Sequence, residues 1–345
     1  MKAYNLTLIP SFLWSLLLLC CFSCQEKQTS PALFEHSGLA LGTSYQITYI
    51  SDKPLDLKKP LDSIFLVINQ SMSTYWPESD ISRINRDDLS VLPDEHLAYN
   101  FKKSKEIHRR SFGYFDPTIA PLVNAYGFGP NKVFTPPDST SIDSLLQLVG
   151  LDKIEINANG FLTKPTGVKL DFNAIAKGYT VDVISHYLKS KKLEHFIVEI
   201  GGELYASGYQ SIKQKPWTLG IEAFNDENFS RDLAQRIQLE NKALATSGSY
   251  RKQRKSPDST QTITHIVDPK TGNATISAVL SASVVADDCI TADAFATAFM
   301  VMPVELILEI APNLTDIELL IYYKDKEGAI TSYETSGFQA LKLSN

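Results

Sequence analysis

Hydrophobic residues recur at helical spacing in several separate stretches of this chain. Apolar positions three and four residues apart predict helices over residues 62–72, 95–110, 142–149, 179–188, 292–302 and 304–311. Shorter apolar runs predict strands over residues 153–157, 168–171, 196–200, 217–221, 237–239, 264–267, 277–285 and 317–323. Because helices and strands do not alternate regularly, this order favours an α+β fold, with mixed sheets and packed helices, over a doubly wound sheet.

The first residues of the chain have the pattern of an export signal. Lys2 precedes a mostly apolar stretch over residues 6–22, and polar residues follow Cys24. A small residue before a cysteine, directly after such a stretch, is typical of a bacterial lipobox. We therefore expect residues 1–23 to be a lipoprotein signal peptide and Cys24 to carry lipid. This places the protein at the membrane of the cell envelope, facing the periplasm.

Two alternatives to this interpretation stay open. Cys20 and Cys21 are the alternative lipid sites, and a permanent transmembrane anchor is the alternative function of the segment. The anchor fits less well, because Pro10 interrupts a stretch that is already short for a span. After the signal, residues 24–36 are expected to be a flexible tether and residues 37–345 the functional domain.

The composition is that of a globular, acidic protein. Hydrophobic residues make up 43% of the chain, and the net charge of −6 becomes −7 (−6 − 1) once Lys2 is removed with the signal. An acidic chain without basic clusters argues against nucleic acid as a partner. Of the four cysteines, only Cys289 remains after lipidation of Cys24, so neither a disulfide framework nor a cysteine-based metal site is expected.

The stretch over residues 171–182 concentrates charge at a predicted strand-to-helix junction. Asp171, Lys177, Gly178 and Asp182 all lie in it. The free N–H groups of a helix start attract phosphate, so this junction is a candidate phosphate site. Lys177 is expected to pair either with phosphate or with Asp171, and a purely structural pair of these two residues is the alternative.

A second charged position lies on the predicted helix over residues 292–302. Asp293 and Thr297 are four residues apart, so they share one face of that helix, one turn from each other. A carboxylate and a hydroxyl placed in this way are suited to a hard cation such as Mg²⁺.

Several shorter segments have both a structural and a functional interpretation. Asp116 is most simply a helix cap, and Gly201–Gly202 a tight turn. Residues 246–250, rich in hydroxyls, either bind an anion or form a plain turn. His265 precedes the turn that begins at Asp268, and by itself a single histidine is more often structural than catalytic.

The order of these segments along the chain is more specific than any one of them. The series comprises Leu41–Thr43, Ser73–Tyr75, Ser79–Asn85, Phe115–Thr118, Asp171–Asp182, Gly201–Glu203, Ala245–Gly248, His265–Gly272 and Asp293–Thr297. It resembles the ApbE family of FAD:protein FMN transferases over roughly residues 38–340. The resemblance implies a T-fold-like domain built from two intimate subdomains.

The resemblance also implies the chemistry. FAD would be the substrate and Mg²⁺ the cofactor, and FMN would be attached through a phosphoester to a Thr or Ser hydroxyl of an exported redox protein while AMP leaves. Residues matching FAD-contacting positions are Leu41, Tyr75, Tyr114, Phe115, Asp116, Asp171, Lys177, His265 and Ile266. The Ala174 carbonyl, Asp293 and Thr297 match Mg²⁺ ligands, and His265 matches the base for the acceptor hydroxyl.

Three departures from the family pattern and several alternative functions accompany this resemblance. Leu41 stands where methionine is usual, Tyr126 where tryptophan is common, and Phe172–Asn173 where a smaller pair precedes Ala174. An FAD pyrophosphatase that uses water as acceptor is the alternative within the same chemistry. A non-catalytic FAD-binding lipoprotein and a solute-binding lipoprotein are the alternatives outside it.

Overall fold

The computed structural model describes residues 30–88, 90–130, 137–224, 231–249, 253–255, 262–274 and 277–343. The expected signal peptide, Cys24 and the first part of the expected tether, up to residue 29, lie outside these residues. Within them, no helix is long and apolar enough to cross a membrane.

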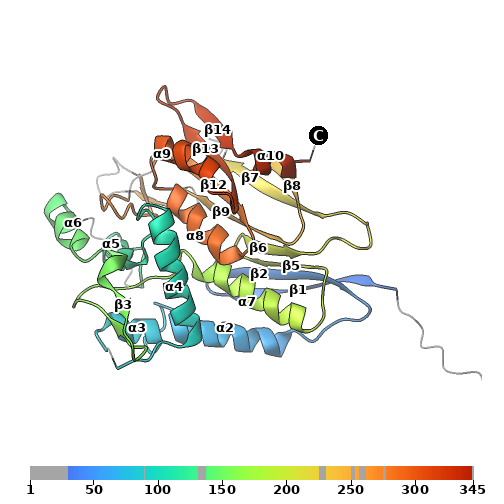
Figure 1. The fold of residues 1–345 in the computed structure, drawn as a ribbon, viewed down its shortest axis with the longest axis horizontal. Coiled ribbons are helices and arrows are strands. Elements are labelled where there is room, and N and C mark those ends of the chain that lie inside the picture. Colours follow the sequence, from blue (N-terminus) through green and yellow to red (C-terminus); the bar gives the residue numbers. More distant parts are fainter. Residues whose placement is uncertain are drawn as a thin grey trace, which may run out of the picture.

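One antiparallel sheet of eight strands organises the molecule (Figure 1). Its strand order is β1-β2-β5-β6-β9-β12-β13-β14, and every neighbouring pair is antiparallel. The strands are β1 (Ala32–Ala40), β2 (Thr43–Ser51), β5 (Phe196–Ile200), β6 (Glu203–Ser207), β9 (Lys242–Gly248), β12 (Val279–Ala286), β13 (Ile317–Lys324) and β14 (Ile330–Glu334). With helices packed on this sheet, the predicted α+β class is confirmed.

Helices cover one face of the sheet and form the main hydrophobic core with it (Figure 1). They are α2 (Lys58–Met72), α4 (Glu95–Arg110), α7 (Ala176–Ser190) and α8 (Cys289–Phe299). Helix α8 is hydrophobic nearly all round, and ten of its residues are buried, as expected for a helix in the middle of a core. Helix α7 packs against both α8 and strand β6.

The opposite face of the sheet is covered by a hairpin of β7 (Trp217–Phe224) and β8 (Arg231–Leu239) and by α10 (Ser336–Leu341). Successive side chains of β13 point to opposite faces of the sheet. Leu319 and Ile321 face the helices, whereas Leu320 packs under the hairpin. Because both faces of the sheet are covered, strands such as β12 are buried along their whole length.

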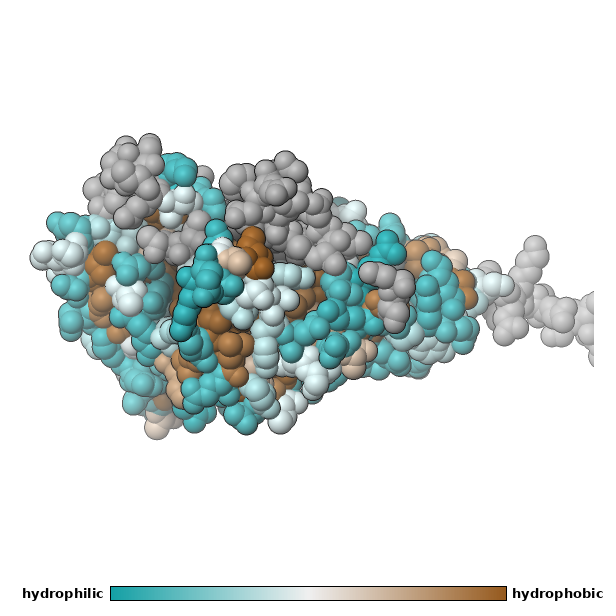
Figure 2. Space-filling view, turned by 90° about the horizontal axis from the view of Figure 1, so that it is seen from above, coloured by the Kyte–Doolittle hydropathy of each residue, from teal (hydrophilic) through white to brown (hydrophobic). Residues whose placement is uncertain are grey.

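A smaller third cluster joins α5 (Ala120–Ala125) and α6 (Ser139–Leu146) to the segment that follows β11 (Thr262–Thr264). The remaining elements are α3 (Asp80–Asn85), η2 (Pro117–Ile119), η3 (Leu151–Lys153), β3 (Glu155–Ile156), β4 (Leu162–Thr163), β10 (Gln253–Lys255), α9 (Val304–Ile310) and η4 (Ala311–Asn313). On the face shown in Figure 2, hydrophilic residues are interspersed with smaller hydrophobic areas.

Three sequence-based expectations about local structure are wrong. The strand predicted over residues 168–171 does not form, because the backbone of Leu170 bonds the side-chain amide of Asn85 in both directions (2.7 and 2.8 Å) instead of another strand. The strand predicted over residues 264–267 ends at Thr264. The expected tether ends too late, since Ala32–Ala40 already pairs with β2 along its whole length.

Candidate functional site

The centre of the site is the contact between the first turn of α7 and the middle of α8. The backbone N–H of Gly178 donates to Oδ2 of Asp293 (2.9 Å) across 115 residues of sequence. Glycine is required for this approach, because a Cβ at position 178 would lie 2.3 Å from the carbonyl oxygen of Cys289. The two motifs that the sequence singled out are therefore in direct contact.

This contact releases a carbonyl oxygen at the start of α7. In a regular α-helix the N–H of residue 178 would donate to the carbonyl of residue 174. Here that N–H is used by Asp293, and no donor within the described ranges bonds the Ala174 carbonyl. The preceding turn is held by Asp171, whose Oδ1 accepts the N–H of Asn173 (2.7 Å), while Phe172 lies in the main core.

Lys177 lies between two buried acids. Its Nζ is 3.1 Å from Oε2 of Glu203 and 3.6 Å from Oδ1 of Asp293. The side chains of Glu203 and Asp293 are only 3% and 2% exposed. The sequence analysis expected Lys177 to pair with phosphate or with Asp171. It did not predict Glu203 as a partner.

Thr297 follows Asp293 by one turn of α8, as the spacing predicted. Its Oγ1 lies 3.5 Å from Oγ of Ser247 on β9. The interpretation of residues 246–250 as a turn is wrong for residues 246–248, which belong to β9 and pair with β12. The strand presents Ser247 toward α8, so its hydroxyl borders the same site.

The oxygen atoms gathered here are of the kind that Mg²⁺ prefers. Asp293 offers a carboxylate, Thr297 a hydroxyl and Ala174 a backbone carbonyl to which no described residue donates. Mg²⁺ uses few protein oxygens and completes its shell with water and substrate phosphate. The residues present therefore fit the ion that the sequence led us to expect. A site built from three or more His, Cys, Asp or Glu side chains is absent from the described part of the chain.

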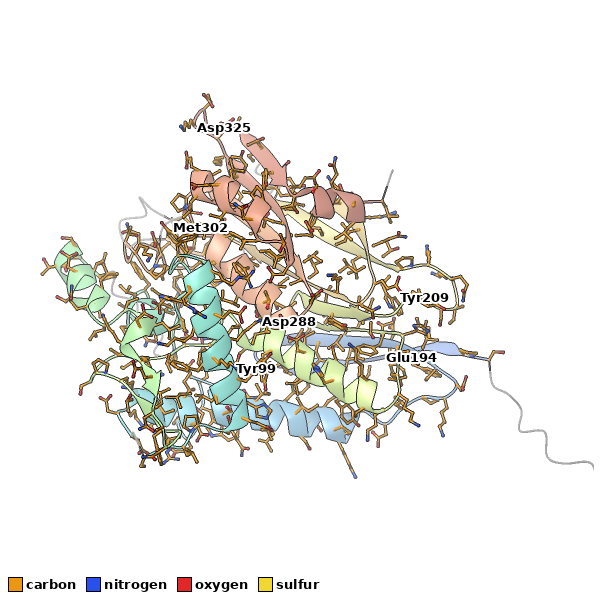
Figure 3. The ribbon with its side chains drawn as sticks, in the orientation of Figure 1. Tyr99, Glu194, Tyr209, Asp288, Met302 and Asp325 are labelled. Atoms are coloured by element: carbon orange, nitrogen blue, oxygen red, sulfur yellow. The ribbon has the colours of Figure 1, made fainter. Side chains whose placement is uncertain are left out.

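A second carboxylate joins the same two helices but serves the fold. Asp182 of α7 accepts the N–H groups of Cys289 (2.8 Å) and Ile290 (2.9 Å) at the start of α8. Burial raises the pKa of Asp182 to about 7, against the opposing effect of these two N–H groups. Asp288 caps the same helix end, which Figure 3 shows close to α4 with Tyr99.

His265 lies among aromatic residues that approach from other parts of the chain. Its ring is 6.3 Å from that of Phe128, in an edge-on arrangement, and the guanidinium of Arg254 lies 5.1 Å from the Phe128 ring. The Tyr75 hydroxyl donates to the Phe128 carbonyl (3.3 Å). Burial, and secondarily the charge of Asp171, raise the pKa of Tyr75.

The turn after His265 lies against Tyr114. Asp268 accepts the N–H of Lys270 (2.8 Å) and the hydroxyl of Thr271 (2.9 Å), so the predicted turn that begins at Asp268 is confirmed. The Lys270 ammonium lies 5.8 Å from the centre of the Tyr114 ring. Burial, followed by the charge of Asp268, raises the pKa of Tyr114.

Phe115 and Asp116 have clear structural uses. Phe115 is buried in the main core. Asp116 caps η2, as its simplest interpretation predicted, by accepting the N–H of Thr118 (2.8 Å), and its second oxygen accepts the N–H of Leu151 (3.1 Å). Contacts of these two residues with FAD, like that of Ile266, stay predictions.

Leu41 occupies the tip of the β1–β2 hairpin. It and Gly42 form a two-residue connection in which both have positive φ, +50° and +76°, the geometry of a type I′ turn. A leucine in this conformation is strained by about 1–2 kcal/mol. Gly201 donates its N–H to the Ser44 carbonyl (3.1 Å), so the tip of this hairpin lies beside the Gly201–Gly202 turn.

Three residues near the site were not singled out by the sequence: Glu203, Ser247 and Arg254. Glu203 and Ser247 lay in recognised segments, but nothing in the sequence showed which strand faces they occupy. Arg254 lies in a short basic run that gave no reason to expect it at the site. Its place in the β10–β11 pair, opposite Ile263, brings it to Phe128 instead.

Comparison with known proteins identifies the family of this chain. The model of the ApbE family matches residues 41–321. A Vibrio cholerae protein named FAD:protein FMN transferase is 32% identical over 311 residues, covering 88% of this chain and 91% of the relative. The Haemophilus influenzae protein of the same name is 30% identical over 335 residues, covering 92% and 93%.

Solved structures give the same result for the fold. The flavin transferase ApbE from Vibrio cholerae aligns with a TM-score of 0.79 at 30% identity, covering 90% of this chain and 99% of that one. The ApbE protein from Thermotoga maritima aligns with a TM-score of 0.79 at 27% identity, covering 91% and 100%. With the family model spanning most of the chain, this protein belongs to the ApbE family.

Proposed function

We propose that this protein is a Mg²⁺-dependent FAD:protein FMN transferase. The observation that carries the proposal is the Gly178–Asp293 contact, which gathers a carboxylate, a carbonyl oxygen and Lys177 at one place. The names of the relatives support the same activity.

The proposed reaction is a phosphoryl transfer. The oxygen of an acceptor Thr or Ser hydroxyl attacks the FMN phosphorus of FAD, the bond from that phosphorus to the bridging oxygen breaks, and AMP leaves with that oxygen. Mg²⁺ held by Ala174, Asp293 and Thr297 would neutralise charge on the diphosphate. Lys177, whose Nζ lies 3.6 Å from Asp293, would add a positive charge beside it.

His265 is proposed to accept the proton of the acceptor hydroxyl. An unperturbed histidine has a pKa of about 6.5 and can take a proton near neutral pH. Its partly buried position beside Phe128 is consistent with a residue at the wall of a binding site. The aromatic rings of Tyr75, Phe128 and Tyr114 are apolar surfaces suited to the flavin or adenine rings of FAD.

The proposal is tested by incubating the purified protein with FAD, Mg²⁺ and an exported flavin-carrying redox protein. We expect a fluorescent, covalently attached FMN on the acceptor, an equal amount of AMP, and neither product when Mg²⁺ is chelated. Release of FMN and AMP without acceptor, and no adduct with it, would identify a pyrophosphatase. Tight FAD binding without AMP would identify a binding protein.

The place of action is part of the proposal. Residues 1–24 support export and attachment of lipid at Cys24, which would hold the enzyme at the membrane of the cell envelope, on the periplasmic side. Incorporation of labelled palmitate into the wild-type chain and Cys21→Ser, but not into Cys24→Ser, is the expected result. Labelling of Cys24→Ser would contradict it.

A further inference from the structure

Glu203 is a buried acid that the sequence placed in a turn motif and gave no role. It is the first residue of β6, directly after Gly201 and Gly202. Both glycines have positive φ (+64° and +107°), and the turn pairs Glu203 with Ile200 in the ladder. Opposite residues of a ladder share one face, and Ile200 belongs to the core on the helix side. The turn therefore directs Glu203 toward α7.

On that side Glu203 approaches Lys177 more closely than Asp293 does. The Nζ of Lys177 is 3.1 Å from Glu203 and 3.6 Å from Asp293. Charges this close and this buried interact strongly, because little water screens them. The position of the ammonium is thus set by both acids, with Glu203 as the nearer partner.

The same group of charges surrounds the first turn of α8. Burial raises the pKa of the Cys289 thiol, and the charges of Asp182, Asp293 and Glu203 raise it further while Lys177 opposes them. Lys177 is thus a cation that opposes these carboxylates at the start of α8. Together with Glu203 and Asp293 it forms a group with a net charge of −1 (+1 − 2).

This arrangement creates a competition for Asp293. Asp293 has already given Oδ2 to the N–H of Gly178, so Oδ1, the oxygen near Lys177, is the one left for a cation. An ammonium that moved fully onto Oδ1 would occupy the lone pairs that a divalent ion needs. Glu203 provides Lys177 with a second, nearer acid.

We infer that Glu203 is a positioning residue, which holds the Lys177 ammonium away from Asp293 so that Asp293 can bind the divalent ion while Lys177 stays charged beside the diphosphate. This inference rests on the proposed function. It assigns Glu203 no contact with FAD and no part in proton transfer. Its effect on metal binding passes through Lys177.

The test is a titration with Mn²⁺ as the probe, followed by electron paramagnetic resonance of the free ion, on the full exported chain without FAD. Partners of metal ligands change metal affinity by about 10–100-fold. We expect Glu203→Gln to weaken Mn²⁺ binding by about tenfold.

Glu199→Gln is the matched control, since Glu199 lies in the same hairpin but alternates with the core-facing residues of β5. Its Oε1 accepts the N–H of Gly202 (2.6 Å), and the amide oxygen of glutamine is able to accept that bond as well. We expect less than a twofold change in Mn²⁺ affinity.

A double-mutant cycle distinguishes action through Lys177 from a simple loss of charge. In a Lys177→Met background the competing ammonium is gone, so Glu203→Gln should change Mn²⁺ affinity by less than about threefold. An equal loss in both backgrounds, or no loss in the wild-type background, would overturn the inference. Glu203→Asp keeps the charge on a shorter side chain, so its Mn²⁺ affinity should fall between those of Glu203→Gln and wild type. If Glu203→Gln does not fold, Glu203→Asp is used in its place.

The two proposals fail in different ways. If the wild-type chain binds no Mn²⁺ and Asp293→Ala changes nothing, the metal assignment itself is wrong, and the role of Glu203 is wrong with it. If the wild-type chain binds Mn²⁺ and loses it in Asp293→Ala, but the cycle is additive, only the role of Glu203 is wrong.

Discussion

Asp182 and Asp293 are both buried carboxylates between α7 and α8, but the structure uses their oxygens differently. Asp182 lies on α7 and spends both oxygens on backbone N–H groups of α8. Asp293 lies on α8, gives one oxygen to the N–H of Gly178 on α7, and turns the other toward Lys177. The first carboxylate joins the helices with both of its oxygens, whereas the second joins them with one and has its other oxygen beside Lys177, where we propose the metal ion binds.

Burial by itself therefore does not mark a functional acid. Asp116 and Asp182 are buried, as Asp293 is, yet their carboxylate oxygens accept hydrogen bonds from backbone N–H groups of the fold. What distinguishes Asp293 is an oxygen that faces a charged side chain instead of a backbone donor. Changing either carboxylate, or the glycine that contacts Asp293, tests this distinction.

Replacing Asp293 should remove activity more than stability. We expect Asp293→Ala to lower Mg²⁺-dependent FMN transfer by more than about 100-fold, since it deletes a ligand and not merely a partner of one. The melting temperature should change little by comparison, because Asp293 contributes only one backbone hydrogen bond. Transfer rate and thermal unfolding, measured on the same preparation, check this. Wild-type transfer rates in Asp293→Ala would show that Asp293, like Asp182, serves only the fold.

Adding a methyl group at Gly178 should disturb both carboxylates together. The Cβ of Gly178→Ala would meet the backbone carbonyl of Cys289 at 2.3 Å, and backbone cannot move aside as a flexible side chain does. We expect α8 to shift, the bond to Asp293 to lengthen, and transfer to fall by about 10–100-fold, together with a lower melting temperature. Gly328→Ala, between β13 and β14, where nothing lies within 4 Å of the added carbon, controls for the loss of glycine at a distant turn.

Replacing Asp182 should remove stability more than activity. At pH 6, Asp182→Ala leaves two buried N–H groups without acceptors, at about 1–3 kcal/mol each. Asp288→Ala removes the cap of the same helix, which accepts a single backbone N–H, that of Thr291, within the described residues, and should cost about 1 kcal/mol. Denaturant unfolding of the two variants gives the comparison. Equal losses of unfolding free energy in the two variants would show that the hydrogen bonds of Asp182 to α8 stabilise the protein no more than an ordinary helix cap.

The free energy of unfolding should depend on pH through the protonation of Asp182. Its pKa in the folded protein is raised to about 7, above the value of about 3.9 for an unfolded chain. Between these values the folded state binds more protons than the unfolded state, so the free energy of unfolding falls as pH rises. Asp288 and Lys103 also face this carboxyl, with opposite effects on its pKa.

The expected size is up to about 1.4 kcal/mol per pH unit for a single group. We therefore expect the stability difference between wild type and Asp182→Ala to shrink as pH rises from about 4 to about 7, and to be constant above. Denaturant unfolding at several pH values measures it. A difference that does not change with pH would mean that Asp182 is not buried as described.

Much of the local structure could be predicted from the sequence. Glu95–Arg110 and Phe196–Ile200 form with the predicted bounds, because their hydrophobic periods are strong and clear capping or turn residues flank them. Strand β9 was missed, since residues such as Thr246 and Ser247 are polar, and their place in a strand depends on the pairing with β12, which lies far along the chain. Residues 168–171 were wrongly predicted as a strand because the side chain of Asn85 competes for their backbone.

The residue types of the site and their order follow from the sequence: an acid and a hydroxyl one helical turn apart, and a lysine at a helix start. The contact of Gly178 with Asp293, the proximity of Glu203 to Lys177 and the use of Asp182 by α8 depend on the tertiary structure. The physical reason is that helical periodicity is a local property of the chain. Which donor takes which oxygen is settled by packing between segments more than a hundred residues apart.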